Sequence, residues 1–136
     1  MNSKKLTLIG LLGAIAVALG ALGAHFLKSK LSTGLITQDQ LIGFDTAVKY
    51  QMYHTLAMLA LVLLSKNNPH KFINWAFNCF FIGILMFSGS LYFLCTRNLF
   101  GADWLKVLGP ITPLGGLFFI VGWIFLALVG LKKDDK

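Results

Sequence analysis

Apolar residues occupy four blocks of this chain, and short polar segments separate the blocks. The blocks cover residues 6–27, 45–64, 72–94 and 113–131. Each is close to the roughly 20 residues that an α-helix needs to cross the apolar core of a bilayer. Because they take up most of the chain, the pattern predicts an all-α, polytopic membrane protein, a bundle of four transmembrane helices that forms one domain over residues 1–136.

The composition agrees with this interpretation. Hydrophobic residues make up 57% of the chain and charged residues only 12%, about half the charged fraction of soluble domains. The net charge of +7 would also suit a nucleic-acid-binding protein, but the lysines flank the apolar blocks, as membrane anchors do. We therefore predict membrane lipids as partners and no nucleic acid. The flanking lysines are Lys4, Lys5, Lys66, Lys71, Lys132 and Lys133.

The start of the chain, residues 1–25, resembles a secretory signal, because Lys4 and Lys5 precede an apolar run that ends in small residues. The run is longer than a typical signal core, so we predict a retained first span. Four spans place both termini and the 66–71 loop on one side, together with seven of the twelve Lys and Arg residues. The excess of positive charge predicts that this side is cytoplasmic.

Two helix starts can be read from the sequence. Thr37 followed three residues later by Gln40 fits a capping box, which predicts that the second helix begins at Gln38 and projects beyond the apolar core. Thr112 and Pro113 are residues typical of an N-cap and of a first helical position. They predict that the fourth helix begins at Pro113.

Small residues recur every four positions in the first span, in two rows on roughly opposite faces. Such rows let helix backbones approach closely. We expect one row to pack inside the bundle. The other either packs there too or forms the contact surface of a homo-oligomer. One row is Ala16, Gly20 and Ala24, and the other is Gly10, Ala14 and Ala18.

The second span carries the richest set of polar residues. Asp45 and Lys49 are four apart, so they can pair on one helix face near the membrane surface. His54 lies near mid-membrane by residue count. An ionisable group at that depth usually faces the interior and is a candidate functional residue, although a neutral histidine bonded to another helix is an equally serious interpretation.

Trp123 also lies near mid-membrane. It faces either the interior, where its indole N–H needs an acceptor, or lipid. With the predicted topology, most polar residues fall in the outer half of the bilayer. We predict an outward-facing polar pocket with His54 and Trp123 as its floor, although helix packing and a tight turn would explain several of its members. The candidate binding residues are His25, Asp45, Lys49, Tyr50, Tyr53, His54, Ser88, Ser90, Thr112, Gly115, Gly116 and Trp123.

These segments resemble a family of small bacterial inner-membrane proteins, domain of unknown function 423, to which eukaryotic transmembrane protein 256 looks related. The matching stretches are GALGAH at 20–25, DTAVKYQMYHT at 45–55, FSGSLY at 87–92, GPITPLGG at 109–116, and Gly122 with Trp123. The resemblance covers essentially the whole chain. It implies a four-span protein of the bacterial inner membrane and implies no activity.

Several functions remain open at this stage. The first is a non-enzymatic binding or accessory protein whose polar pocket holds a lipid headgroup or a small amphiphile. The alternative is a small dimeric transporter that uses His54 for proton coupling. A haem protein with His25 and His54 as axial ligands fits less well, because the two residues differ in predicted depth. An enzyme is the remaining class, but the sequence presents no catalytic triad and no metal-ligand spacing, so we predict neither catalytic residues, metal nor cofactor.

Overall fold

The computed structural model describes residues 3–131, and this part of the chain is helical with no strand. It contains four helical stretches that are long and apolar enough to cross a membrane: Ser3–Leu31, Gln38–Asn67, Lys71–Phe100 and Asp103–Leu131. The predicted fold class is confirmed. The stretches extend several residues beyond most of the predicted block ends, because polar residues at the block ends continue the helices.

The first half of the chain forms a helical hairpin. Helix α1 (Ser3–Leu22) runs into a π-helical turn, η1 (Gly23–Leu27), and a short helix, α2 (Lys28–Leu31). Helix α3 (Gln38–Asn67) then returns. The predicted capping box is confirmed, since the Thr37 hydroxyl accepts from the N–H of Gln40 at 3.2 Å and the Gln40 side chain accepts from the N–H of Thr37 at 2.9 Å.

The second half forms a second hairpin. Helix α4 (Lys71–Gly83), the π-helical turn η2 (Ile84–Ser88) and helix α5 (Gly89–Thr96) lead to two 3-10 helices, η3 (Arg97–Phe100) and η4 (Asp103–Leu108), before α6 (Ile111–Leu131). The predicted N-cap at Thr112 is wrong. Helix α6 begins at Ile111, two residues before the predicted start at Pro113. Thr112 therefore lies inside the helix, and its hydroxyl bonds to that of Ser90 at 2.6 Å.

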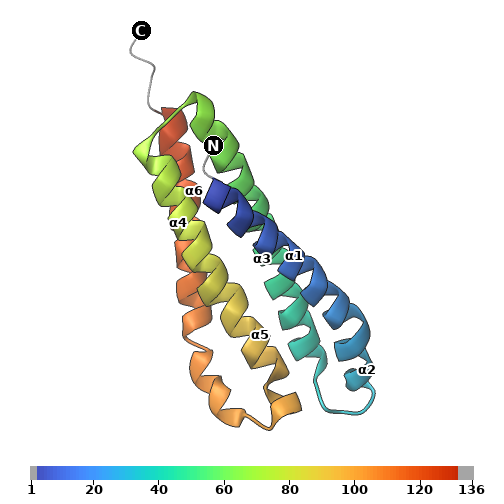
Figure 1. Cartoon of the computed structure of the whole chain (residues 1–136). Coiled ribbons are helices and arrows are strands. Elements are labelled where there is room, and N and C mark those ends of the chain that lie inside the picture. Colours follow the sequence, from blue (N-terminus) through green and yellow to red (C-terminus); the bar gives the residue numbers. More distant parts are fainter. Residues whose placement is uncertain (1–2, 132–136) are drawn as a thin grey trace.

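The two hairpins lie side by side, as Figure 1 shows. Helix α1 packs on α3, α4 packs on α6, and α3 joins the pairs by packing on α4, η2 and α5. The first residues of α1, the last residues of α6 and the 68–70 connection share one end, which we call the terminal end. The opposite end, with the 32–37 connection and helices η3 and η4, is the loop end.

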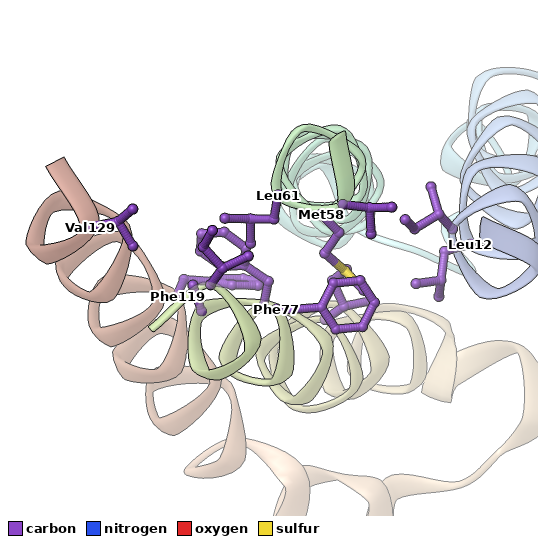
Figure 2. Packing of buried hydrophobic residues seen from close by; sticks show 12 residues of the cluster. Leu12, Met58, Leu61, Phe77, Phe119 and Val129 are labelled. Atoms are coloured by element: carbon purple, nitrogen blue, oxygen red, sulfur yellow. The ribbon is translucent and has the colours of Figure 1, made fainter. Parts of the chain in front are cut away.

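A hydrophobic core runs through the terminal half of the molecule. Figure 2 shows Met58 of α3 and Phe77 of α4 in the centre of this cluster, with Leu12 of α1 and Val129 of α6 at its two edges. Among the described residues, α1 and α6 make no extensive contact with each other. The four helices therefore form an open array in the order α1, α3, α4, α6 and not a closed ring. Within the described residues α3 and α6 also make no extensive backbone contact, because α4 and η2 lie between them on one side.

The two rows of small residues in α1 have different surroundings. Ala16 is fully buried, and a Cβ on Gly20 would lie 3.3 Å from the side chain of Val48, so this row faces α3, although Ala24 at its end is exposed. Gly10, Ala14 and Ala18 are all exposed. The outward row is therefore the one that a homo-oligomer would use, and the oligomer itself stays a prediction.

Candidate functional site

The open side of the helix array contains an aromatic groove between α3 and α6, next to η2. Its volume is about 810 Å³. Side chains from all three elements line it: Tyr50, Tyr53, His54, Phe87, Pro113, Gly116, Leu117, Phe119, Ile120 and Trp123. Leu117 and Ile120 are more than half exposed, so the groove opens sideways, onto the surface that lipid covers in a membrane-spanning chain.

His54 lies at the base of the groove with both ring nitrogens hydrogen-bonded. Its Nδ1 is 2.7 Å from the backbone oxygen of Tyr50, and its Nε2 is 3.2 Å from the indole nitrogen of Trp123. A carbonyl only accepts and an indole N–H only donates. These partners therefore define the proton positions: His54 is neutral, with the proton on Nδ1 and the acceptor lone pair on Nε2.

The imidazole of His54 is also part of an aromatic cluster. It stacks on Phe119 with 3.5 Å between ring centroids and an interplanar angle of 8°. Tyr50 stacks on Phe87 at 4.8 Å. Because α3 and α6 make little direct backbone contact within residues 3–131, the contacts of Phe119 with His54 and Tyr50 and the Trp123–His54 hydrogen bond connect the two helices.

Trp123 combines an inward polar group with an outward ring. The structure brings it together with His54, as the residue counts predicted, and its N–H points at the imidazole. The side chain nevertheless remains 47% exposed. Trp123 therefore forms the edge of the groove and not the enclosed floor that we expected. His54, at 5% exposed, is the only one of the pair that faces the interior.

Two phenol hydroxyls lie along the groove without a partner in the described part of the chain. Tyr50 and Tyr53 are 40% and 56% exposed, and neither hydroxyl forms a hydrogen bond to another described residue. Tyr50 lies one helical turn from His54 toward the loop end, and its ring contacts Phe87 and Phe119. The free polar groups of the groove are therefore hydroxyls, which can donate and accept, and the remaining surface is aromatic and aliphatic.

Two serines, one threonine and one glycine among the candidate binding residues do not line this groove, and each has a structural task. Ser88 is fully buried and donates to the backbone oxygen of Ala47 at 2.7 Å, which ties η2 to α3. Ser90 and Thr112 bond to each other. A Cβ on Gly115 would overlap the backbone of Phe87, so this glycine permits close packing of α6 on η2. Ser88, Ser90 and Thr112 therefore do not line the groove.

The charged candidate binding residues do not line the groove. Asp45 and Lys49 form the expected ion pair at 2.6 Å, with both side chains more than half exposed, but neither lines the groove. His25 is exposed in η1 and also lies outside it. The groove thus contains His54, Tyr50, Tyr53, Gly116 and Trp123 from the predicted set.

Sequence reasoning missed two kinds of residue. Phe87 and Phe119 are central to the aromatic cluster, but a phenylalanine in an apolar block gives no signal that separates it from ordinary core residues. Gln51 does carry a signal, since a buried amide in a span must find partners. Its Nε2 donates to the backbone oxygen of Leu12 and its Oε1 accepts from the Tyr92 hydroxyl.

Comparisons with known proteins agree on one family. Residues 19–116 match the family described as protein of unknown function DUF423. A protein of Haemophilus influenzae named UPF0382 membrane protein is 43% identical over 135 residues, which cover 99% of both chains. One of the same name from Staphylococcus epidermidis is 41% identical over 130 residues, covering 95% of this chain and 97% of the relative.

No solved structure shows a significant similarity to the chain. The family match covers most of the sequence, and the relatives, themselves named membrane proteins, align from end to end. These findings agree with the four apolar helices and with the resemblance seen in the sequence motifs. The chain is a membrane protein that belongs to the family described as protein of unknown function DUF423.

Proposed function

We propose that the protein is a non-enzymatic binding protein whose aromatic groove holds a small amphiphile taken from the surrounding lipid. The observation that carries this proposal is the combination of an open, aromatic-lined groove with two phenol hydroxyls that lack partners among the described residues. A hydroxyl within a membrane span gains free energy when it finds a hydrogen-bonding group, because the apolar core offers none.

The lining favours a particular kind of occupant. Phe87, Phe119 and Ile120 offer an apolar surface for a chain or a flat ring, while Tyr50 and Tyr53 offer hydrogen bonds to one small polar group. A large charged headgroup finds no counter-ion there, since the ion pair of Asp45 and Lys49 lies outside the groove. Of the two occupants predicted from the sequence, the geometry supports the small amphiphile.

The other functional hypotheses gain less support. A transporter that couples to His54 must protonate it, but the hydrogen bond from Trp123 already occupies the Nε2 lone pair. Haem ligation by His25 and His54 would need the same nitrogen of His54, and His25 lies outside the groove. Both would require the Trp123–His54 bond to break first.

We further propose that the protein lies in the bacterial inner membrane with its terminal end in the cytoplasm. The support is the lysine distribution, because Lys4, Lys5, Lys66 and Lys71 belong to the terminal end and positive residues accumulate on the cytoplasmic side. Lys132, Lys133 and Lys136, which contribute to the same bias, lie outside the described residues. In this orientation the groove's tyrosines lie toward the outer leaflet.

Photochemical labelling in a membrane tests the groove. The probe is a monoacylglycerol with a diazirine in its acyl chain, incorporated into lipid nanodiscs with the purified protein. We expect crosslinks at Leu117 and Ile120. Gly116→Leu places a side chain in the groove and removes the crosslinks, whereas Gly130→Leu, on the same helix at a position with open space around it, retains them.

A second comparison tests the polar contacts. Tyr50→Phe and Tyr53→Phe keep the aromatic rings but remove the hydroxyls, so we expect each to reduce crosslinking about threefold, the effect of one ordinary hydrogen bond. Equal labelling of the groove and of the outward face of α1, unchanged in Gly116→Leu, would show that the probe contacts the protein only as bulk lipid does.

A further inference from the structure

A second hollow lies at the loop end, between α1 with η1 on one side and the first turns of α3 on the other. Its volume is about 340 Å³, and it shares no residue with the aromatic groove. Small residues, aliphatic residues and three polar side chains line it: Gly20, Gly23, Ala24, Lys28, Gln38, Leu41, Ile42, Phe44, Asp45 and Val48.

The π-helical turn η1 explains why a lysine lines this hollow. In a continuous α-helix, residues seven apart lie on the same face. The N–H of Lys28 donates to the oxygen of Gly23, five residues back, so the turn holds about one residue more than an α-helical turn. That extra residue brings Lys28, eight positions after Gly20, onto the face that Gly20 presents to α3.

Small side chains keep the hollow open. Gly23 is in close contact with Phe44, where a Cβ would lie 3.0 Å from the ring, and Gly20 approaches Val48. These contacts set the distance between α3 and the stretch formed by α1 and η1, and all four residues line the hollow. Ala24 is exposed and lines the space without filling it. The helices are therefore held close together along the cavity, and the polar lining residues Lys28 and Gln38 lie toward the loop end.

The charges of the hollow do not cancel. The carboxylate of Asp45 is 2.6 Å from the ammonium of Lys49, which neutralises it. Lys28 forms no ion pair with any carboxylate of residues 3–131. Gln38, the first residue of α3, also lines the hollow, and the N-terminus of a helix attracts negative charge. Asp39 also belongs to this first turn but does not line the hollow, so among the lining residues Lys28 carries the charge that no ion pair within residues 3–131 balances.

The position of the hollow relates it to the membrane surface. Helix α3 has 30 residues and is about 45 Å long, whereas the apolar core of a bilayer is about 30 Å thick. The excess length puts polar helix ends at headgroup level, and Gln38 and Asp39 mark the start of α3 as such an end, while Ile42 and Val48 lie farther along the helix toward the apolar region. The cavity thus has Lys28, which no carboxylate of residues 3–131 pairs with, near headgroup level, and aliphatic side chains nearer the apolar core. A phospholipid has the same order of groups, with its phosphate at headgroup level and its acyl chains in the apolar core.

We propose that this hollow binds the phosphate of an anionic phospholipid through Lys28, with the glycerol backbone over Ala24 and the start of an acyl chain against Ile42 and Val48. The site is separate from the groove and does not depend on the function proposed for it. The aliphatic wall distinguishes a lipid from inorganic phosphate, which would gain nothing from Leu41, Ile42 or Val48.

Native mass spectrometry of the full-length protein tests this proposal. The protein is mixed with equal amounts of phosphatidylglycerol and phosphatidylcholine that have identical acyl chains, and the ratio of the two bound lipids is measured. We expect phosphatidylglycerol to be preferred. In Lys28→Gln the preference falls about fivefold, as loss of one lysine near an anionic lipid surface predicts.

The chain offers a matched control for each variant. Lys30 is two residues away, and its ammonium lies over the Phe26 ring outside the hollow, so Lys30→Gln leaves the preference unchanged. Ala24→Leu fills the hollow and removes the preferred lipid, whereas Ala21→Leu, an exposed position outside it, does not. Thermal unfolding of each variant in detergent checks that it remains folded.

The outcomes separate this site from the alternatives. Equal losses in Lys28→Gln and Lys30→Gln would overturn the proposal in favour of a diffuse surface charge. A wild-type protein without preference for phosphatidylglycerol would also overturn it. Inorganic phosphate is the probe for a free-anion site, and displacement of bound phosphatidylglycerol by phosphate at matched ionic strength would refute the lipid. Crosslinking in the aromatic groove is expected to be unchanged in Lys28→Gln.

Discussion

Gln51 connects three helices through the hydrogen bonds of its side-chain amide. From α3 it donates to the backbone of α1 at Leu12 and accepts from Tyr92 of α5 at 2.7 Å. Ser88 adds a bond from η2 to α3. In an apolar medium, where helix association gains little from the hydrophobic effect, such bonds specify which helix faces meet.

Trp123→Phe is the sharpest test of the bond at His54. The substitution keeps an aromatic ring but removes the one donor to Nε2 among residues 3–131. We expect the free energy of unfolding to fall by about 1–2 kcal/mol, the usual cost of leaving a buried acceptor unsatisfied, with the lower values typical of membrane proteins. Unfolding in mixed micelles with increasing dodecyl sulfate measures this change.

Trp75→Phe is the matched control for this prediction. Trp75 is exposed to almost the same extent, 46% against 47%, and its ring also packs on a phenylalanine, but its indole N–H bonds to no described residue. We expect a smaller loss for Trp75→Phe. Equal losses would mean that the indole of Trp123 acts only through its apolar area and that the bond to His54 contributes no stability.

Counting residues from a helix end predicts the depth of a side chain in the membrane but not the direction in which it points. Counting from helix ends brought His54 and Trp123 to the same level, because depth along a helix depends only on the rise per residue. The same counting gave the depth of Ser88 and Ser90 but not the direction of their side chains, which do not line the groove. A serine in a span bonds as readily to a neighbouring backbone oxygen as to a ligand, and only the packing of η2 on α3 decides between them.

The elements owe their close packing to glycines on the inner faces of the helices. Helix α6 approaches η2 and α4 through Gly115 and Gly122, and a Cβ on Gly122 would strike the Phe80 ring. The π-helical turn η2 carries Phe87 and Ser88 into this region. One face of α6 therefore packs directly on η2 and α4 through its glycines, and the adjacent face of α6 lines the groove.

Two neighbouring glycines of α6 give a direct prediction. In Gly115→Ala the new methyl group overlaps the backbone of Phe87, which cannot rotate away, so we expect a loss of about 1–3 kcal/mol through overpacking. In Gly116→Ala the methyl group meets only the Phe87 ring at an ordinary 3.8 Å. The same dodecyl sulfate titration compares the two, and similar stabilities would show that α6 lies farther from η2.

A helix start was predictable where the capping side chains form hydrogen bonds with residues only three positions away. The capping box at Thr37 and Gln40 needs no other part of the chain, so sequence alone locates the start of α3. Thr112 is not the cap because α6 already begins at Ile111, which makes Thr112 the second residue of the helix, and its hydroxyl bonds to Ser90, 22 residues away in sequence. The π-helical turns were not predicted, since their extra residue has no marker in a run of apolar and small side chains.

At the scale of the whole molecule, the orientation in the membrane is open to direct test. In a protein with Cys79→Ser and Cys95→Ala, we expect a cysteine at Thr33 to react with an impermeant maleimide in intact cells. A cysteine at Ser3 is expected to resist. Both positions are exposed, so both react once the cells are permeabilised. The reverse pattern would place the terminal end outside and move the groove's tyrosines to the inner leaflet.

The architecture as a whole was predictable because each span carries its own signal of length and apolarity. The open arrangement of the spans was not, because contacts such as Gly83 on Phe119 or Gly43 on Cys95 depend on which helices become neighbours. Sequence reasoning therefore predicted four helices and the depth of their polar residues, and left open the side on which α3 and α6 stay apart.

The grouping into two hairpins has a consequence for biosynthesis. Helices α1 and α3 leave the ribosome before α4 has been made, so the contacts of Gly20 and Gly23 with α3 can form at once. The bonds of Gln51 to Tyr92 and of Ser88 to Ala47 need α4, η2 and α5 as well. The groove, whose walls come from both hairpins, can therefore be completed only after α6 has been made.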